Sequence, residues 1–408
     1  MTTPTVFRDV RVFDGTAVRP DDTVIVQDGV IAAVGTGLPV PPGATVIDGR
    51  HRASLLPGLI DAHTHVLGQA LRQALRFGVT TELDMANDPD LIRDAKARQH
   101  GAEGAGLADL RSAGSAATVP GGHGTDFMPG APTLTDPREA PAFVAARIAE
   151  GSDYLKIHYE DGQLRSRMTG KPPVPVLSLP IMRALVVAAH ERGLRVLVHV
   201  GTLAAARDAI ESGVDGLAHV FVDAPPDPGF GRLAAERGVF AVPTLVMIEQ
   251  LTDPAAVAGL ADDPALAPYL ASEDRGLLAR YRSGGAPAPL ADMSVPNAAV
   301  RALAAHGVPI LAGSDSVFAL HGAALHRELH LLCRAGLSPA AALTAATAAP
   351  AAAFGLADRG RVAPGLRADL LLVDGDPAAD IGDLGRIAGI WKSGVAVDRS
   401  PAFVPANR

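Results

Sequence analysis

The chain has 408 residues, of which 48% are hydrophobic and 20% are charged. This size and balance fit one large globular domain with a smaller one attached, or two domains. Asp and Glu outnumber Lys and Arg by 44 to 36, the formal charge is −8, and no Lys/Arg-rich run stands out. These features argue against nucleic-acid and anionic-membrane partners and favour chemistry on a small-molecule substrate.

The single cysteine, Cys333, can form no intrachain disulfide and lies in an apolar helical pattern. A buried thiol is a more common fate for such a residue than a reactive one. The N-terminus lacks a basic segment followed by an apolar one, and no apolar run approaches the length of a membrane span. We therefore expect a cytoplasmic protein, and the oligomeric state stays open, a homo-oligomer included.

Residues 1–55 are expected to form the first part of a small β-sandwich domain. Short segments there alternate apolar and polar residues between Gly and Asp turns, as in TVFRDVRVFDG, DTVIVQDGVIAAVG and ATVIDG. Segments of the same character return in residues 358–408, as GRVAPGLRADLLLVDGDP and IAGIWKSGVAVDR. The pattern predicts that the two ends of the chain build one composite sheet domain.

Between these ends, residues 56–357 alternate strand-like and helical segments. The strand-like segments, in chain order, are LIDAH, VTTELDM, LADLRSAG, YLKIHY, RVLVHV, GLAHVF, VFAVPTL and PILAGSD. Such alternation predicts an α/β fold with parallel strands and crossover helices, and eight strands fit a closed (β/α)8 TIM barrel. Residues near 250–295, rich in Ala, Pro and Asp, are expected to form an insertion or lid after the seventh strand.

The first barrel strand ends in PGLIDAHTHV, which places His63 and His65 one residue apart. In an extended strand, side chains at i and i+2 point to the same side, so both imidazoles can converge on a metal ion. One such pair in a chain with 13 histidines is a weak signal on its own. The positions of the other histidines and acidic residues can distinguish a metal site from ordinary packed histidines.

Further residues that can bind a metal fall in or at the ends of later predicted strands, namely Lys156 in the fourth, His199 in the fifth, His219 in the sixth and Asp315 in the eighth. In a (β/α)8 barrel, the chemistry sits at the C-terminal ends of the strands. A packed histidine is the ordinary alternative for each position alone, but their joint placement favours one metal site. Imidazole and carboxylate ligands without thiolate suit an open catalytic site for Zn²⁺ or a similar ion.

The motifs DAHTH, VLVHVG, GLAHVF, GSDS and the closing GRVAPGLRADLLLVDGDP resemble, in this order, the marks of the amidohydrolase superfamily. The resemblance covers nearly the whole chain. It implies a barrel with a composite β-sandwich, and hydrolysis at an amide, ester or related centre by metal-activated water or hydroxide. Within the superfamily, GSDYLKIHYEDG resembles the prolidase-like, imidazolonepropionase-related branch, which acts on dipeptides and N-acyl amino acids.

In that branch the strand-four lysine is carboxylated and bridges two metals, and the resemblance assigns this role to Lys156. A bare ammonium would be repelled by two cations, whereas a CO2-derived carbamate is an anionic oxygen ligand. The alternative is a structural or substrate-contacting Lys156 beside a single metal. Oxygen and imidazole ligands serve Zn²⁺, Mn²⁺, Co²⁺ and Fe²⁺ alike, so the native metal stays open.

The resemblance also distributes the roles within the site. His63 and His65 with Asp315 would hold the more buried ion, and His199 with His219 the more exposed one. Asp315 would in addition serve as the catalytic acid and base that moves the proton from water to the leaving group.

A glycine-rich loop, VPGGHGTDF, follows the third strand, and its His123 resembles a catalytic histidine that contacts the substrate carbonyl. The alternative is an exposed histidine on a surface loop. Members of the branch commonly carry a carboxylate-binding tyrosine two residues after the strand-five histidine, but this chain has Gly201 there. Recognition of a free carboxylate is therefore in doubt, and a roomier pocket for another amide, carbamate or ester is expected.

Two other functions are alternatives. A mononuclear deaminase of the same superfamily uses a glutamate soon after the strand-five histidine, which HVGTLAAA lacks. A non-catalytic barrel scaffold would be expected to have lost metal ligands, and none of the positions above is lost. Most of the other histidines were expected on the surface or behind the ligands, since they were placed on helices or away from strand ends: His51, His100, His158, His190, His306, His321, His326 and His330.

Overall fold

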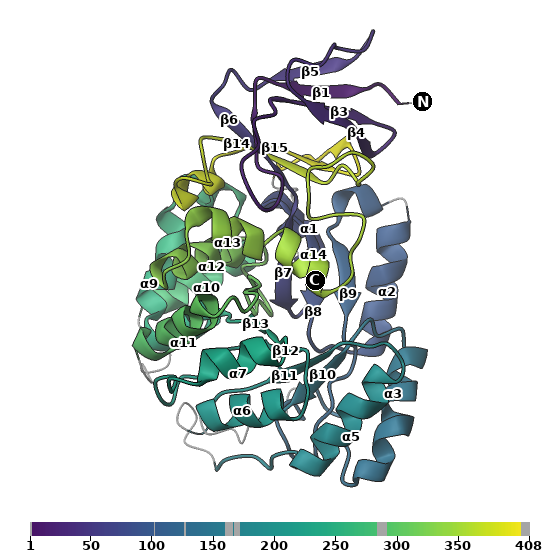
Figure 1. The fold of residues 1–408 in the computed structure, drawn as a ribbon, viewed down its shortest axis with the longest axis vertical. Coiled ribbons are helices and arrows are strands. Elements are labelled where there is room, and N and C mark those ends of the chain that lie inside the picture. Colours follow the sequence, from purple (N-terminus) through teal and green to yellow (C-terminus); the bar gives the residue numbers. More distant parts are fainter. Residues whose placement is uncertain are drawn as a thin grey trace.

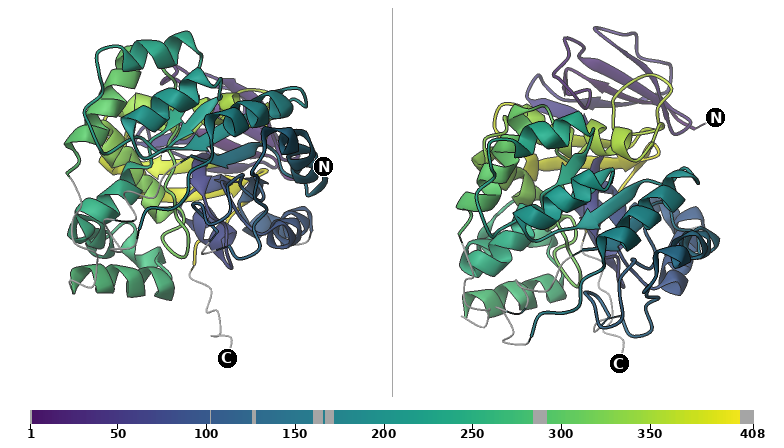
Figure 2. Two further views of the ribbon diagram at one scale, coloured as in Figure 1. Left: turned by 90° about the horizontal axis from the view of Figure 1, so that it is seen from below. Right: turned by 60° about the horizontal axis from the view of Figure 1, so that its bottom comes forward.

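The computed structural model describes residues 2–101, 103–125, 128–159, 166, 172–283 and 292–400. Sheets formed largely by the two ends of the chain lie at one end of the molecule (Figure 1). Parallel strands with helices on both sides make up the rest, as two further views show (Figure 2). In the described ranges, no helix combines the length and apolar character needed to cross a bilayer.

Two sheets form the end region. The first has the order β4-β3-β1-β5, with bounds Val30–Gly35, Thr23–Gln27, Thr5–Arg8 and Thr45–Asp48. The second has the order β16-β15-β14-β6-β2, with bounds Val395–Ala396, Ile387–Lys392, Leu370–Asp374, Ala53–Pro57 and Arg11–Val12. Because β6 and β14 pair along their whole lengths, the second sheet joins the N-terminal and C-terminal parts of the chain.

Alternation along the second sheet explains its place between two cores. Leu55 and Leu370 face a small core that they share with the first sheet and Trp391. Their neighbours Leu56 and Leu371 face the opposite way, into the large core of the helical region. Successive strand residues point to opposite faces, so a sheet covered on both sides needs apolar residues at consecutive positions.

Two parallel sheets run through the helical region. One is β7-β8-β9, with bounds Leu59–Thr64, Val79–Asp84 and Asp109–Ser112. The other is β10-β11-β12-β13, with bounds Leu155–His158, Val196–His199, Gly216–Ala218 and Phe240–Val242. A parallel bridge between Ala117 and Ile157 links the segment after β9 to β10. These strands match the first seven predicted ones in position and order.

The predicted eighth strand, around residues 309–316, forms single parallel bridges instead of a continuous strand. Ile310 bridges Ala241 of β13, and Ser316 bridges Thr64 of β7. The segment therefore connects the free edges of both parallel sheets. Its ladder is interrupted because Pro309 has no N–H to donate and Asp315 adopts a left-handed φ of 53°, which extended backbone does not allow.

Helices follow most of these strands. Their bounds are Ala70–Arg76 (α1), Pro89–His100 (α2), Ala140–Ala149 (α3), Leu179–His190 (α5), Leu203–Glu211 (α6), Phe230–Glu236 (α7), Leu245–Thr252 (α8), Ser294–Ala305 (α11), Ala323–Arg334 (α12), Pro339–Ala345 (α13) and Ala348–Ala353 (α14). Short 3-10 helices span Gly104–Gly106, Pro137–Glu139 and Ile381–Gly385.

The expected insertion at residues 250–295 is helical where it is described. It comprises the end of α8, α9 (Pro254–Ala258), 3-10 helices at Gly259–Asp262 and Ala267–Tyr269, α10 (Ser272–Arg282) and the start of α11. Residues 284–291 of this expectation, like residues 401–408 of the C-terminal sandwich part, lie outside the described ranges.

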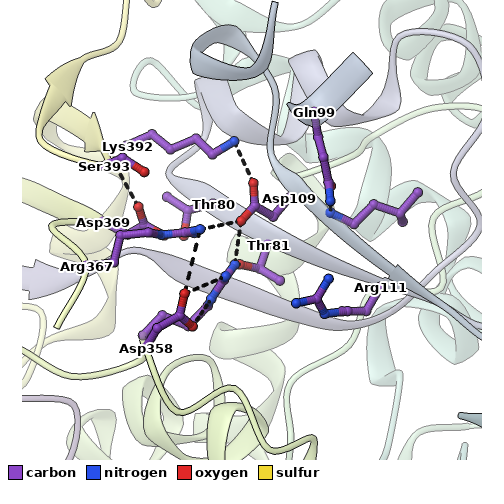
Figure 3. Close-up of polar contacts among 12 residues, drawn as sticks. Thr80, Thr81, Gln99, Asp109, Arg111, Asp358, Arg367, Asp369, Lys392 and Ser393 are labelled. Carbon is purple, nitrogen blue, oxygen red and sulfur yellow. Dashed lines mark hydrogen bonds and ion pairs between the residues drawn. The ribbon is translucent and has the colours of Figure 1, made fainter. Parts of the chain in front are cut away.

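A buried ionic cluster joins the sandwich to the parallel strands. Asp109, the first residue of β9, receives Arg359 Nη1 at 2.7 Å, Arg367 Nη1 at 2.5 Å and Lys392 Nζ at 2.7 Å. The surrounding cations hold the pKa of Asp109 well below its ordinary value, although burial opposes its ionisation. Figure 3 shows Arg367 and Lys392 reaching Asp109 from the C-terminal segment. Ion pairs between residues far apart in sequence therefore connect the sandwich to the parallel strands.

Candidate active site

The histidine pair at the end of β7 converges on Asp315. His63 is fully buried and His65 is half-buried. Their Nε2 atoms lie 3.3 Å and 3.2 Å from Asp315 Oδ1. Asp315 lies beside β7 because its backbone N–H donates to the His63 carbonyl at 2.7 Å. The i, i+2 spacing thus places both imidazoles beside the same oxygen, Asp315 Oδ1.

His219 completes a compact donor set with His63 and Asp315. One ligand atom of each residue lies within 4.8 Å of those of the other two. His219 follows β12 with a left-handed φ of 72°, and Asp315 has a φ of 53°. Non-glycine residues in this conformation cost about 1–3 kcal/mol each and gather at functional sites. This backbone strain turns both side chains toward the same point.

Hydrogen bonds fix the tautomers of two of these imidazoles. His65 Nδ1 lies 2.9 Å from the Ala86 carbonyl, which can only accept, so Nδ1 carries a proton. His219 Nδ1 lies 2.6 Å from Thr244 Oγ1, whose own proton goes to the Pro243 carbonyl at 2.8 Å. His219 Nδ1 must therefore donate as well. In the neutral form, both rings turn an unprotonated Nε2 toward the site, as metal-binding histidines do.

Burial also shapes the charges of the site. Burial, and then Lys156, lower the pKa of His63 to about 3, so its imidazole is neutral at neutral pH. Burial likewise lowers the pKa of Lys156 to about 7. Burial opposes the ionisation of Asp315, but the nearby His63 and His65 imidazoles hold its pKa well below the ordinary range. The neutral His63 imidazole thus lies beside an anionic Asp315 carboxylate. Burial opposes the protonation of His65, but its contact with Asp315 raises its pKa above the ordinary value.

The donor set fits a divalent metal ion. Among the described residues, neither ring nitrogen of His63 has a hydrogen-bond partner of normal geometry, although both are buried. Buried polar atoms are nearly always satisfied, so these nitrogens point to a ligand that the chain itself does not supply. Imidazoles with one carboxylate form the usual ligand set for zinc and related catalytic ions. His63, His65, His219 and Asp315 are the residues that could hold one ion.

A second group of imidazoles continues from this set. The ring of His199, the last residue of β11, lies 4.5 Å from the ring of His219 and 4.4 Å from that of His123. Lys156 of β10 is buried beside them and lines the same cavity. All the site residues predicted from the sequence thus line one cavity, with Lys156 inside β10 and the others at strand ends or in the segments that follow the strands.

His158 is a site residue that the sequence interpretation placed wrongly. The sequence pattern predicts it away from the strand ends, but it is the last residue of β10 and pairs with His199 of β11. It is buried, it lines the same cavity, and its Nδ1 lies 3.0 Å from the His123 carbonyl. The missed signal was its i+2 spacing from Lys156, the same spacing that revealed His63 and His65.

The remaining histidines lie outside the cavity lining. His51, His100, His190 and His306 are exposed, and His330 is half-buried. His321 is buried with Nδ1 3.2 Å from Glu82 Oε1, and the buried His326 lies with Nε2 2.8 Å from the Phe77 carbonyl.

The candidate site opens into a cavity of about 730 Å³. Its polar lining includes His63, His65, Lys156, His199 and Asp315, and Gly201 lines it two residues after His199. Apolar side chains line it as well. A volume of this size is typical of small-molecule sites with a few convergent polar groups.

Comparison with known proteins identifies the family to which the chain belongs. The profile of the amidohydrolase family matches residues 54–397. Imidazolonepropionase of Cereibacter sphaeroides is 26% identical over 396 residues, covering 90% of this chain and 92% of that one. The crystal structure of a Xaa-Pro dipeptidase with methionine in its active site is 22% identical, with a TM-score of 0.75, and covers 97% of this chain and 100% of that one.

The crystal structure of phenylurea hydrolase B is 25% identical, with a TM-score of 0.74 and 99% of each chain covered. The family profile confirms the superfamily that the sequence motifs indicated. The similarity to imidazolonepropionase and the shared fold with the Xaa-Pro dipeptidase agree with the branch that the motifs indicated. They imply the architecture of a TIM barrel with a β-sandwich. The chain belongs to the amidohydrolase family and is a hydrolase that acts on C–N bonds.

Proposed function

We propose that this amidohydrolase uses metal-activated water to cleave an amide, carbamate or ester bond of a small molecule, such as a dipeptide or N-acyl amino acid. The observation that carries the proposal is the compact donor set of His63, His219 and Asp315, with ligand atoms within 4.8 Å of one another. This set lies at the floor of a cavity large enough for a small substrate.

The architecture belongs to the same proposal. We take residues 56–357 as a closed (β/α)8 barrel, with residues 1–55 and 358–408 as the two parts of the sandwich. The bridges from Ile310 to Ala241 and from Ser316 to Thr64 support closure, because they join the outer strands of the two parallel sheets. A closed barrel brings all strand ends to one face, where the proposed ligands would meet.

The site is proposed to hold two divalent ions, with zinc as the first candidate and Mn²⁺, Co²⁺ or Fe²⁺ as alternatives. His63, His65 and Asp315 would bind the more buried ion, and His199 and His219 the more exposed one. Support comes from the ring of His219, whose centroid lies 4.7 Å from that of His63 and 4.5 Å from that of His199. His219 thus lies close to the ligands proposed for the buried ion and to His199, the other ligand proposed for the exposed ion.

Lys156 is proposed to bridge the ions as a CO2-derived carbamate. Only a neutral amine can attack CO2, and burial lowers the pKa of Lys156 to about 7, so a large share of the amine is neutral near pH 7. An ordinary lysine would be almost entirely protonated at this pH. The fully buried amine is therefore suited to carbamate formation.

A divalent ion in this site would lower the pKa of a bound water to roughly 7 and polarise the scissile carbonyl. Asp315, ionised at neutral pH, accepts the proton of the attacking water and passes it to the leaving nitrogen or oxygen. His123 is proposed to orient the substrate carbonyl. Its own carbonyl is held by Thr118 Oγ1 at 3.0 Å and by His158 Nδ1 at 3.0 Å, which keeps its loop segment in place.

The substrate need not carry a free C-terminal carboxylate. Gly201 occupies the lining position beside His199 where related enzymes are expected to have a carboxylate-binding tyrosine. One structural neighbour is a Xaa-Pro dipeptidase and another is a phenylurea hydrolase. We therefore propose a broader amide, carbamate or ester hydrolase in preference to a strict Xaa-Pro dipeptidase.

A substrate panel tests the proposal. Purified protein supplied with Zn²⁺, Mn²⁺ or Co²⁺ is assayed against dipeptides, N-acyl amino acids, aryl amides, carbamates and esters, with the Asp315→Asn variant as the matched control. We expect turnover of at least one amide or carbamate that depends on both metal and Asp315. Turnover of Xaa-Pro dipeptides alone would contradict the argument from Gly201, and ammonia release from an aminated heterocycle alone would indicate a deaminase. A complete lack of turnover with any metal would favour a non-catalytic scaffold.

A further inference from the structure

The cavity above the candidate site has an apolar wall made by side chains from different parts of the chain. Leu67, Met128, Val222, Met247, Leu251 and Phe318 contribute to it. Met247 and Leu251 lie one turn apart on α8, so both face the cavity from one side of that helix. Several apolar side chains around one opening give a surface that favours an apolar ligand group.

Two apolar residues that line the cavity, Phe318 and Leu91, are unusually exposed for their type. Phe318 is 82% exposed and Leu91 is 50% exposed, and both border the cavity. Single exposed apolar residues are common on protein surfaces. Here, however, they lie at the rim of an apolar cavity, where a bound ligand would cover them and gain hydrophobic contact.

The charges around the cavity disfavour an anionic ligand group. Asp88 lies at the rim, where its carboxylate caps α2 by accepting the Asp90 N–H at 2.8 Å. Asp315 contributes a second carboxylate at the floor. Among the described lining residues, Lys156 is the one basic side chain besides the histidines, and it is buried beside the proposed metal ligands. A carboxylate that lies against the apolar wall, and so does not reach the proposed metal ions, would thus lose its hydration without gaining a cationic side chain as partner.

We propose that the substrate presents an uncharged apolar group, such as a substituted phenyl ring, to the wall formed by Met247, Leu251 and Phe318, and carries no free carboxylate there. This inference rests on the proposed function, because it names the substrate class of the same site. It differs from what a dipeptidase needs, since a dipeptide ends in a carboxylate. The enzyme would then favour apolar anilides, carbamates or related neutral compounds over dipeptides and N-acyl amino acids.

A neighbouring cavity offers the competing arrangement. It has a volume of about 650 Å³ and shares Asp315, Val317 and Phe318 with the first cavity. Arg280 of α10 lines it and could pair with a carboxylate from that side. The test must therefore separate a substrate group held by the apolar wall from one held by Arg280.

The test uses two acetanilides that differ only at the para position. 4′-Methylacetanilide carries a methyl group there, and 4-acetamidobenzoate carries a carboxylate. We expect kcat/KM of the metal-supplied enzyme to be at least about tenfold higher for the methyl compound, because the carboxylate must lose hydration at an apolar surface. Phe318→Arg and Phe318→Gln, at an exposed position where folding is not at risk, should both shrink this ratio, and Phe318→Arg should shrink it more because it also offers the carboxylate a cationic partner.

Binding is measured separately from turnover. Calorimetry on the Asp315→Asn variant should show tighter binding of the methyl compound than of the carboxylate compound, even though this variant turns over neither. If no compound of any class is hydrolysed by the wild-type enzyme but this preference in binding persists, the proposed function fails and the apolar site stands. Equal or tighter binding of the carboxylate compound would overturn the inference. Preferred turnover of 4-acetamidobenzoate that is lost in Arg280→Gln would also overturn it and assign recognition to the neighbouring cavity.

Discussion

The ionic junction between the two regions of the molecule predicts a large effect from one substitution, Asp109→Asn. Asp109 contacts Arg359, Arg367 and Lys392 at 2.5–2.7 Å, and its side chain is only 15% exposed. The asparagine keeps the size of the side chain but removes its negative charge. Asp358 and Asp369 still pair with Arg359 and Arg367, but both arginines lose one carboxylate partner. Lys392 loses its carboxylate partner and keeps hydrogen bonds to the Gly104 and Leu107 carbonyls.

The expected loss follows from this burial. Breaking a buried ion pair by removing one partner costs about 3–5 kcal/mol, because the remaining charge stays desolvated. The slight exposure of Asp109 and the retained amide oxygen reduce this figure, so we expect a loss of roughly 3 kcal/mol in the free energy of unfolding. Asp358→Asn is the matched control, because Asp358 contacts Arg359 in the same cluster but its side chain is 53% exposed. That change should cost less than about 1 kcal/mol.

Urea unfolding followed by circular dichroism, with wild type, Asp109→Asn and Asp358→Asn measured side by side, provides the assay. The transition that separates or unfolds the sandwich should shift to lower urea in Asp109→Asn and barely move in Asp358→Asn. Equal shifts in the two variants, or a loss below about 1 kcal/mol for Asp109→Asn, would refute the reasoning from burial.

Further predictions concern the site and its surroundings. Asp315→Asn should lower kcat at least about 100-fold with the fold and much of the metal retained, and near-wild-type kcat would exclude it as the acid and base. Lys156→Ala should lower metal content and activity together, with partial rescue by a short carboxylic acid, and unchanged metal content would argue against a ligand role. His158→Phe should lower kcat/KM about tenfold by removing one of the two hydrogen bonds that hold the His123 carbonyl. His158→Asn, which retains a donor, should recover most of this loss, and equal losses in both variants would contradict the positioning role. Burial raises the pKa of Glu328 from 4.5 to about 8, so the folded state keeps a proton that the unfolded state has lost, and stability should fall as pH rises through this window. Glu328→Gln should be more stable than wild type at pH 9 but not at pH 4, and an unchanged pH profile would refute this.

The sequence predicted much of the fold and the residues of the candidate site because both depend on local spacing. The alternation of strand-like and helical segments predicted the strands up to β13. The tripeptide His63-Thr64-His65 indicated the end of a strand. His158 was not predicted as a site residue, although it has the same i+2 spacing from Lys156 as His65 has from His63. The eighth strand was predicted, but its interruption was not, because the left-handed backbone at Asp315 depends on tertiary contacts.

Other features could not be predicted from spacing at all. The Asp109 cluster joins positions about 250 residues apart, so its charges meet only after the sandwich packs on the parallel strands. The tautomer of His219 depends on Thr244, which follows a different strand. Such contacts arise from the assembled fold and leave no periodic pattern in the chain.

The protein is proposed to hold two metal ions with Lys156 between them. A crystal structure of the zinc-saturated protein, with data collected at the zinc absorption edge, would locate the ions. We predict two anomalous peaks per chain, one beside His63, His65 and Asp315 and one beside His199 and His219, with density for a planar carboxyl group on Lys156 Nζ between them. A single peak with an unmodified Lys156 side chain would contradict the account.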